Sequence, residues 1–180
     1  MSHPRPWETL EFELLARYKV FEVGRKRARS PRTGDEHFFY TIGADDWVNV
    51  VPVTPDDQIV MVRQYRHGCE QITLEIPGGI VDPGETPAEA AARELLEETG
   101  YRAREVSPLG VVNPNPALFA NRCYTFLAAG VERVAEIQND GGTEETSVEL
   151  VPRVDLPRRL RAGDIDHALV VAALLWFDLT

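Results

Sequence analysis

The chain has 180 residues, of which 43% are hydrophobic and 27% charged, so we expect one globular domain with a small attached arm. Its formal net charge of −10 argues against nucleic-acid binding, which requires a basic surface. The longest apolar run, residues 168–177, falls far short of the about 20 residues of a membrane helix, which predicts no transmembrane segment. The opening MSHPRPWE has no apolar signal-peptide core, and Cys69 and Cys123 form no CxxC motif, so we expect a cytoplasmic protein.

The first 43 residues are expected to form an arm. Residues 11–23 and 37–42 have the extended, mixed pattern of strands, which predicts an N-terminal hairpin or small sheet. The basic segment between them contains Pro31 and Gly34, and we interpret it as a solvated loop rather than a binding site. Residues 44–180 then form the main domain.

The next segments are rich in valine and isoleucine and predict strands of a mixed central sheet. They cover residues 47–53 and 59–65, with a turn at Asp56–Asp57 between them. Trp47 opens the first of these strands. This residue, like Trp7 near the N-terminus, is either part of the core or a platform on which a nucleobase stacks.

A helix is predicted from residue 87 to residue 99. Thr86 followed by Pro87, with Glu89 three residues after the threonine, is a capping box with proline at the first helical position. Gly100 is a natural end for the helix. At about 100° per residue, its side chains separate into two faces. The expected core face comprises Ala88, Ala91, Ala92, Leu95, Leu96 and Thr99, and the opposite face comprises Arg93, Glu94, Glu97 and Glu98.

The acidic face of this helix is electrostatically unfavourable by itself. Glu94, Glu97 and Glu98 are neighbours on the helix surface, where like charges repel by about 0.2–0.5 kcal/mol per pair. They also lie near the helix C-terminus, where the helix dipole disfavours anions. Arg93 can pair with Glu97, which leaves at least two charges uncompensated. The face is therefore either solvated or bound to a hard divalent cation such as Mg²⁺ or Mn²⁺.

The residues before the helix favour the metal-binding interpretation. Gly78 and Gly79 end the apolar run 72–77 and predict a strand that passes through a glycine-bearing loop into the acidic helix. Glycine permits a positive φ and close approach of the backbone to a ligand. This loop is therefore expected to bring backbone carbonyls and amides beside the carboxylates.

The remaining chain is expected to alternate strands and loops before two final helices. The predicted strands cover residues 105–112, 123–128 and 147–151, and the helices residues 154–161 and 164–179. Residues 113–122 contain two prolines and three asparagines, which excludes regular structure. Residues 140–145 form an acidic, glycine-containing loop that is either a solvated turn or part of an active site.

The stretch that begins at Gly79 resembles the Nudix box. Gly79, five residues, Glu85, seven residues and then RELLEETG, which ends at Gly100, match every fixed glycine and polar position of that motif. Only Tyr101 departs from it, at a position where an aliphatic residue is preferred. The resemblance implies an α/β fold, a Nudix-type α/β/α sandwich with a mixed central sheet, here with an N-terminal β arm. It also implies a hydrolase in which water attacks a phosphorus of a diphosphate.

The resemblance, carried over position by position, implies a metal site and its support. The expected metal ligands are Glu94, Glu97, Glu98 and the carbonyl of Gly78. Mg²⁺ is the expected ion, with Mn²⁺ as an alternative, and Glu97 and Glu98 are thereby expected to be catalytic. Arg93 is expected to hold the carboxylates in place through charge-assisted hydrogen bonds, with Glu85 as its partner across the loop.

Within that family the chain resembles the ADP-ribose and nucleotide-sugar pyrophosphatases. In this subgroup an RQYR segment lies beside the substrate, so Arg66 is either a phosphate contact or a surface arginine. A proline beyond the box is typical of hydrolases of ADP-ribose, but Ala117 and Asn121 depart from the subgroup's glycine and acidic residue. The expected substrate contacts are Arg66, Trp47 and Pro116.

The subgroup also suggests a catalytic base and an oligomeric state. Its base is often held on a mobile loop after the box, for which Glu145 is the first choice, followed by Glu144 and Glu149. Arms like residues 1–43 help such enzymes to form a homodimer, which is therefore expected here.

These features predict a Mg²⁺-dependent pyrophosphatase that hydrolyses nucleoside diphosphate sugars, of the ADP-ribose, ADP-sugar and GDP-mannose class, to a nucleoside monophosphate and a sugar phosphate. Two alternatives stay open. One is a MutT-like pyrophosphohydrolase of nucleoside triphosphates, and the other is a noncatalytic Nudix-like domain that senses a ligand. The intact set of glutamates favours an enzyme, because a sensor is expected to have lost some of them.

Overall fold

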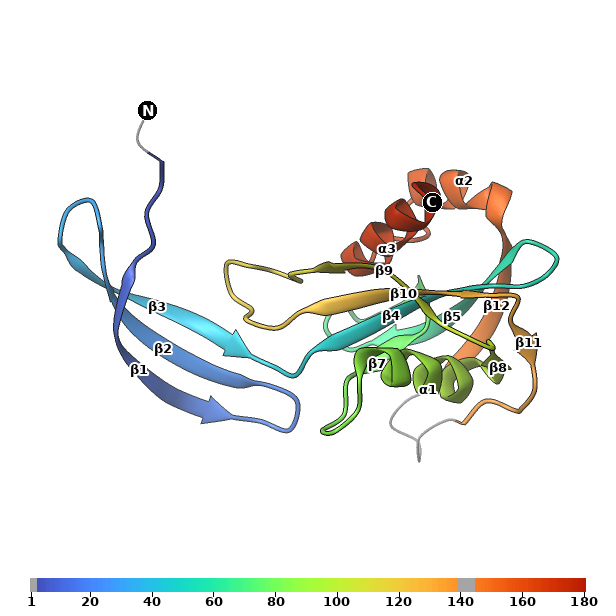
Figure 1. Ribbon diagram of the computed structural model, residues 1–180, viewed down its shortest axis with the longest axis horizontal. Helices are drawn as coiled ribbons and strands as arrows, with labels where there is room; N and C mark the ends of the chain where they lie inside the picture. The colour runs from blue at the N-terminus through green and yellow to red at the C-terminus, as the bar shows by residue number, and fades with distance from the viewer. Residues whose placement is uncertain (1–2, 139–144) are drawn as a thin grey trace. The chain divides into compact units, whose positions relative to one another are not determined.

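The computed structural model describes residues 3–138 and 145–180 (Figure 1). The internal contacts of the chain divide it into two units. The first unit consists of Met1–Asp45 and Asn113–Arg122, and the second of Asp46–Val112 and Cys123–Thr180. None of the helices in the described ranges combines the length and hydropathy that a membrane span requires.

The first unit is built on a three-stranded antiparallel sheet in the order β1-β2-β3. Its strands are β1 (Glu8–Arg17), β2 (Glu22–Arg29) and β3 (Glu36–Gly43). The expected N-terminal sheet is confirmed. The interpretation of the basic segment as a loop is wrong for residues 25–29, which belong to the central strand of this sheet.

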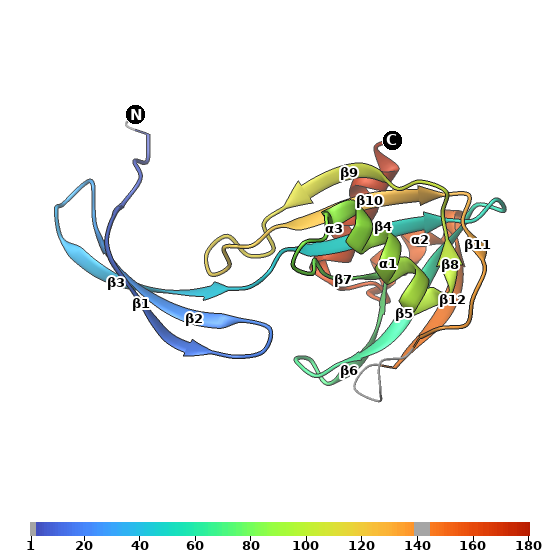
Figure 2. The ribbon, with the colours of Figure 1, turned by 60° about the horizontal axis from the view of Figure 1, so that its bottom comes forward.

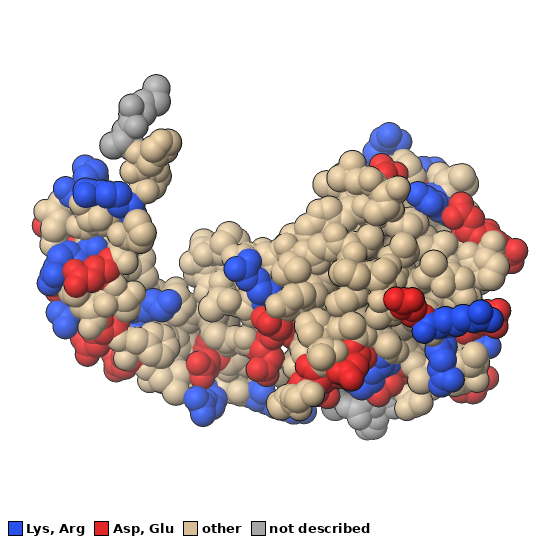
Figure 3. All heavy atoms as spheres, viewed as in Figure 1, with Lys and Arg blue, Asp and Glu red and all other residues tan. Residues whose placement is uncertain are grey.

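Cross-strand ion pairs explain why an arginine-rich segment forms a strand. The pairs are Arg25–Glu13, Arg27–Glu11, Arg27–Glu36, Arg29–Glu8 and Arg29–Glu36. Each arginine of β2 thus faces at least one glutamate on a neighbouring strand, and opposite charges in this arrangement favour the pairing of strands. Figure 3 shows the acidic and basic side chains side by side over this sheet.

The segment 113–122 belongs to the first unit and contains no regular helix or strand, as its prolines and asparagines predict. A single β-bridge joins Phe119 to Ile42 of β3. Asn121 is buried, and its side-chain amide donates a hydrogen bond to the carbonyl of Asp45 (2.9 Å). The asparagine that stands where the subgroup has an acidic residue therefore has a structural contact.

The second unit contains a seven-stranded mixed sheet (Figure 2). Five strands follow the order β12-β5-β4-β10-β9, while β6 pairs with β5 and β7 pairs with β4. The pair β4–β10 is parallel and the other pairs are antiparallel. The strands are β4 (Trp47–Val53), β5 (Gln58–Arg66), β6 (Gln71–Glu75), β7 (Gly78–Ile80), β9 (Ser107–Val112), β10 (Cys123–Ala129) and β12 (Thr146–Pro152). A separate two-stranded sheet joins β8 (Tyr101–Arg102) to β11 (Glu132–Arg133).

Helices cover both faces of this mixed sheet, which confirms the α/β/α sandwich (Figure 2). Successive residues of a strand point to opposite faces. On β4, Val50 packs in the core cluster of α1 (Pro87–Thr99), whereas Val51 packs in that of α2 (Leu156–Ala162) and α3 (Ala168–Asp178). A short 3₁₀ turn, η1 (Arg153–Asp155), precedes α2.

The last helix differs from the prediction in where it begins. It starts at Ala168 rather than at residue 164, because Gly163 ends α2 in the left-handed conformation (φ 77°) and His167 is extended (ψ 117°). The residues of α3 that are fully buried are Val170, Ala173, Leu174 and Phe177, so Leu169, Ala172 and Trp176 of the predicted face are only half-buried. Ile165 is buried as expected, but it lies in the link before the helix.

Candidate active site

The acidic helix begins and ends where its sequence predicts. The hydroxyl of Thr86 accepts a hydrogen bond from the N–H of Glu89, and the carboxylate of Glu89 accepts one from the N–H of Thr86 (2.8 Å), which forms the capping box. Pro87 is the first helical residue. At the other end Gly100 adopts the left-handed conformation (φ 72°), and its N–H donates to the carbonyl of Leu96 (2.8 Å).

The buried face of α1 is close to the predicted one, except that Ala90 is buried in place of Ala92. Ala90, Ala91, Leu95 and Thr99 are buried, whereas Ala92 is exposed, so the inclusion of Ala92 in the core face is wrong. The helix turns its small residues toward the sheet because alanine allows close packing on the strands. This orientation leaves the arginine and the glutamates on the opposite side, where they are half-buried rather than fully solvated.

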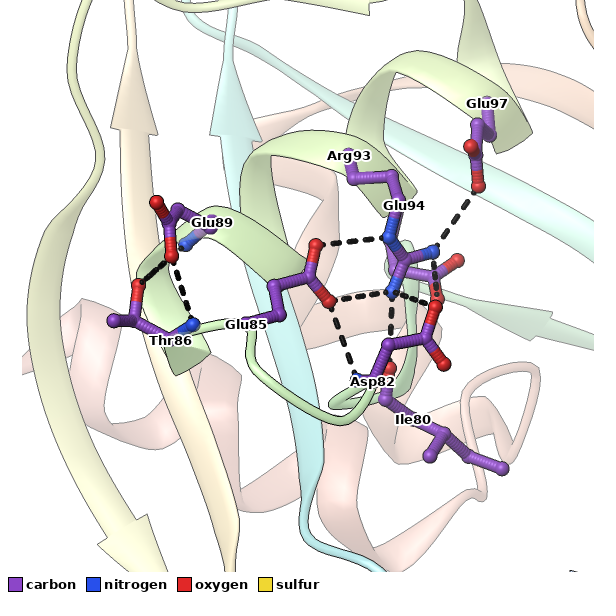
Figure 4. A network of polar contacts seen from close by, with 8 residues as sticks. All are labelled: Ile80, Asp82, Glu85, Thr86, Glu89, Arg93, Glu94 and Glu97. Atoms are coloured by element: carbon purple, nitrogen blue, oxygen red, sulfur yellow. Dashed lines mark hydrogen bonds and ion pairs between the residues drawn. The ribbon is translucent and has the colours of Figure 1, made fainter.

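Arg93 is the centre of a network of carboxylates (Figure 4). Its Nε and one terminal nitrogen donate to the two oxygens of Glu85, both at 3.0 Å. The other terminal nitrogen donates to Glu94 (2.8 Å) and to Glu97 (3.1 Å). A further hydrogen bond reaches the carbonyl of Ile80 on β7 (3.0 Å). One guanidinium thus joins the helix, the loop before it and the glycine strand.

This network shifts the pKa of Glu85 and that of Arg93. The hydrogen bonds from Arg93 hold the pKa of Glu85 below its ordinary value. The hydrogen bonds that Arg93 donates to Glu85, together with those to Glu94 and Glu97, raise the pKa of Arg93 above its ordinary value, so that the guanidinium stays charged. Glu85 and Glu94 are 17% and 14% exposed, and a carboxylate this sheltered from water requires such a partner.

The glycines before the helix form a strand, not the predicted loop. Gly78 and Gly79 lie on β7 and pair with Asn49 and Val48 of β4. The N–H of Gly78 donates to the carboxylate of Glu98 (2.9 Å), which ties the strand to the last turn of α1. The backbone amide expected beside the carboxylates is therefore present, although it is positioned by strand pairing.

Close approach explains why these two positions are glycines. A Cβ atom on Gly79 would lie 2.2 Å from a carboxylate oxygen of Glu94. A Cβ atom on Gly78 would lie 2.2 Å from the backbone carbonyl oxygen of Val48. Neither glycine is among the residues with positive φ, so space rather than conformational freedom decides the residue type.

The donor set fits a hard divalent cation. Four carboxylates and one guanidinium gather here, so negative charge is in excess over positive charge, and the donors are oxygen atoms. Across residues 3–138 and 145–180, no three His, Cys, Asp or Glu side chains already surround a common point as metal ligands do. In this structure Glu94 and Glu97 face Arg93, and Glu98 faces Gly78.

The segment proposed to hold the catalytic base is attached to the same helix at both flanks. The N–H of Gln138 donates to the carbonyl of Glu97 (2.8 Å), and the hydroxyl of Thr146 donates to the carbonyl of Glu98 (3.1 Å). Glu145 is exposed and immediately precedes Thr146. Glu144 lies outside the described residues.

Glu149, the third choice for the base, is held by two arginines. Its carboxylate accepts hydrogen bonds from Arg63 (2.7 Å) and Arg159 (2.6 Å), and these link β12 to β5 and α2. The side chain is 25% exposed. It is therefore part of an ion-pair cluster formed by β12, β5 and α2, and not part of the Arg93 network.

The three predicted substrate contacts belong to different parts of the chain. Arg66, the last residue of β5, forms a bidentate ion pair with Glu75 of β6 at 2.9 and 2.7 Å. Trp47 begins β4, is half-buried, and pairs with Ile80 of the glycine strand. Pro116 is exposed and belongs to the first unit.

The burial and ion pairing of Glu75 were not predicted, although its position in the sequence indicated them. Glu75 is an acidic residue within the apolar run 72–77, and it is buried in the structure. A charged residue between apolar neighbours in a strand is rarely buried without a partner. A search for that partner would have led to an arginine on an adjacent strand.

Comparisons with known proteins agree with this geometry. Residues 44–174 match the NUDIX domain family. ADP-ribose pyrophosphatase of Mycobacterium tuberculosis is 30% identical over 176 residues, which cover 94% of this chain and 82% of that protein. ADP-ribose pyrophosphatase of Bacillus subtilis is 32% identical over 130 residues, which cover 71% of this chain and 70% of that protein. The crystal structure of an ADP compounds hydrolase is similar with a TM-score of 0.85 and 25% identity, and the match covers 99% of this chain and 95% of the other.

An α/β/α sandwich in which a glycine strand leads into an acidic helix held by an arginine is the arrangement of a Nudix-type site. The chain belongs to the NUDIX family, because the family match spans most of its length and one relative is 30% identical over 94% of it. It is accordingly a Nudix hydrolase, as the resemblance of residues 79–100 implied.

Proposed function

We propose that this hydrolase splits nucleoside diphosphate sugars, ADP-ribose included, into a nucleoside monophosphate and a sugar phosphate in a Mg²⁺-dependent reaction. The observation that carries the proposal is the cluster of glutamates that Arg93 holds on α1 beside β7. The two ADP-ribose pyrophosphatases to which the chain is similar support the substrate class. The free thiols of Cys69 and Cys123 support a reducing, cytoplasmic setting.

The acidic cluster is suited to hold the metal ion on which this reaction depends. The residues that would hold Mg²⁺ or Mn²⁺ are Glu94, Glu97, Glu98 and Gly78, the last through its carbonyl. When bound, such an ion neutralises charge on the diphosphate oxygens and lowers the pKa of water. Arg93 and Glu85 would keep the carboxylates in place, and Glu145 would accept the proton of the attacking water. Arg66 would contact the diphosphate and Trp47 would stack on the base.

A substrate panel tests this proposal. The purified protein is incubated with ADP-ribose, GDP-mannose, UDP-glucose and nucleoside triphosphates. The nucleoside monophosphate formed from either kind of substrate is detected by anion-exchange chromatography, which involves no metal-dependent coupling enzyme that a chelator would also inhibit. We expect turnover of at least one nucleoside diphosphate sugar, complete loss of that turnover with a chelator, and its return when Mg²⁺ is added. Titration calorimetry of Mg²⁺ against the protein measures metal binding separately.

Two results would replace the proposed function with one of its alternatives. Turnover of the triphosphates alone would assign the protein to the MutT-like pyrophosphohydrolases. Binding of a nucleotide without turnover of any member of the panel, in saturating Mg²⁺, would indicate a sensor.

We further propose that the chain forms a homodimer through the first unit. One face of its sheet carries Phe12 and Leu14 of β1 and Phe39 of β3, which the strand register places on the same side. Phe12 and Phe39 are 53% and 43% exposed, and Trp7 packs edge-to-face against Phe39 with ring centroids 5.1 Å apart. Exposed apolar patches on stable proteins commonly mark association surfaces.

Sedimentation equilibrium tests the dimer. The wild type is expected to have twice the mass of the chain, and the variant Phe12→Glu combined with Phe39→Glu is expected to be monomeric. The variant Val154→Glu, which changes an exposed apolar residue of the second unit, serves as the control and should remain a dimer. A monomeric wild type at micromolar concentration would contradict the proposal.

A further inference from the structure

Glu75 is a charged residue in the interior of the second unit. Its side chain is 4% exposed, and its neighbours Leu74 and Ile76 are buried in the core of the sheet. An ionised carboxylate removed from water is strongly destabilising unless other groups compensate its charge. The presence of a glutamate in this strand therefore calls for a specific set of partners.

Three side chains lie around the carboxylate of Glu75. Arg66 of β5 donates from Nε and from a terminal nitrogen to the two oxygens of Glu75, at 2.9 and 2.7 Å. Thr73 donates its hydroxyl to the same carboxylate (2.6 Å). His167, which precedes α3, has its Nδ1 atom 3.9 Å from Glu75. Burial by itself raises the pKa of Glu75, but the hydrogen bonds and the charge of Arg66 outweigh it, so the pKa lies below its ordinary value. Glu75 is a carboxylate when it holds Arg66.

The other end of this ion pair reaches the surface. The side chain of Arg66 is 43% exposed, so the pair has one buried partner and one that solvent can approach. The contact with Glu75 uses two of the five N–H groups of the guanidinium. Only Ile76 and Pro77 separate Glu75 from Gly78, so the two Cα atoms are at most about 11 Å apart. The ion pair is therefore close to the glycine strand of the acidic site.

A second arginine of β5 provides a comparison. Arg63 is equally exposed, at 41%, and also binds a carboxylate, that of Glu149. Arg66 lies three positions after Arg63, and because this spacing is odd, their side chains leave opposite faces of the strand. Glu149 is shared with Arg159 of α2, and that cluster links elements of the fold. The pair formed by Arg66 differs, because its carboxylate is buried next to the strand that carries the acidic site.

We propose that Glu75 is a positioning residue, which holds the guanidinium of Arg66 in the orientation that binds the diphosphate of the substrate. This inference rests on the proposed function, in which Arg66 contacts the substrate. A bidentate carboxylate fixes both the position and the plane of a guanidinium, which a single hydrogen bond does not. The side chain is then ordered before the substrate arrives, and less entropy is lost on binding.

Kinetics of a double-mutant cycle test the proposal. The variants Arg66→Ala, Glu75→Gln and Arg66→Ala/Glu75→Gln are assayed on ADP-ribose, or on whichever nucleotide of the panel the wild type hydrolyses fastest. Glutamine keeps the shape of glutamate and still has a carbonyl oxygen that accepts a hydrogen bond from Thr73. It has no negative charge and only one acceptor oxygen, so it cannot hold Arg66 through two charge-assisted hydrogen bonds. We expect KM to rise about tenfold in Glu75→Gln, a size typical of coupled residues in contact, while kcat changes much less. In the Arg66→Ala background, Glu75→Gln is expected to raise KM no further.

Two comparisons separate positioning from a purely structural role. Arg63→Ala is the matched control on the same strand, and its KM is expected to equal that of the wild type. Arg66→Lys keeps the positive charge beside Glu75 but loses the planar fork, so it is expected to raise KM with little change in the melting temperature. This variant also decides the question if Glu75→Gln fails to fold.

Defined results would overturn the inference. An unchanged KM in folded Glu75→Gln, or a KM effect that adds in full to that of Arg66→Ala, would show that Glu75 does not act through Arg66. An unchanged KM in Arg66→Lys would show that the planar guanidinium held by Glu75 does not contribute to substrate binding, and would also overturn the inference. Because the assay follows whichever nucleotide is turned over, a wild type that prefers triphosphates would overturn the proposed substrate class and still leave this comparison decisive.

Discussion

Glu98→Gln is expected to lower kcat for ADP-ribose hydrolysis at least about 100-fold, because the charge through which a metal-dependent site binds its cation is lost. Glu98 lies in the last turn of α1, and its carboxylate accepts a hydrogen bond from the N–H of Gly78. Glutamine keeps the size of the side chain and a hydrogen-bond acceptor. Steady-state kinetics measure the loss of turnover, and titration calorimetry measures the accompanying loss of affinity for Mg²⁺.

Glu89→Gln is the matched control for this variant. It removes the same charge from the same helix, but glutamine also serves in a capping box with Thr86, so both kcat and stability should stay close to those of the wild type. Glu145→Gln, in contrast, is expected to lower kcat without a change in Mg²⁺ affinity, because Glu145 is proposed as the general base, which takes a proton and does not bind the ion. Equal kinetics for Glu98→Gln and the control would remove Glu98 from the active site.

Gly79→Ala is expected to lower kcat by about 100-fold while the protein stays folded, because a shift of about 1 Å in a reacting or metal-binding group has an effect of this size. The added Cβ would lie 2.2 Å from a carboxylate oxygen of Glu94. That oxygen is at the far end of a flexible side chain, so the carboxylate can move aside and the backbone can stay in place. Kinetics and thermal unfolding of the same preparation measure the two effects.

Two other glycine substitutions make this prediction specific. Gly78→Ala would place its Cβ 2.2 Å from the backbone carbonyl oxygen of Val48, which cannot rotate away. The free energy of unfolding is therefore expected to fall by about 1–3 kcal/mol. Gly68→Ala places its Cβ in open space, so neither activity nor stability should change. If Gly79→Ala unfolds as Gly78→Ala does, or keeps full activity, the close approach of Gly79 to Glu94 has no catalytic role.

The helix that carries the candidate site could be predicted almost to the residue. Its two ends depend on Thr86, Pro87 and Gly100, which act on their immediate neighbours and need no tertiary partner. The strands at residues 47–53 and 59–65 were also predicted well, because valine and isoleucine favour a buried sheet whatever its topology. Local chemistry was sufficient in both cases.

The errors occurred where a partner distant in sequence decides the local structure. The arginines of β2 suggested a solvated loop. In the structure they lie on a strand because they form ion pairs with glutamates of the strands on either side. Gly78 and Gly79 suggested a loop, and pairing with β4 makes them a strand. The pairing of Arg66 with the buried Glu75 was not predicted either, because Glu75 lies on the neighbouring strand β6.

By itself the sequence determined the family and the acidic helix with its caps. It also predicted which glutamates and which arginine share one face of that helix in the candidate site, because helix geometry fixes the spacing of these residues. Only the tertiary structure decided which groups each of them contacts. Arg93 reaches Ile80, Glu98 reaches Gly78 and Arg66 reaches Glu75 through the pairing of strands and the packing of α1 on the sheet. Such contacts depend on the register between segments, which no single stretch of sequence encodes.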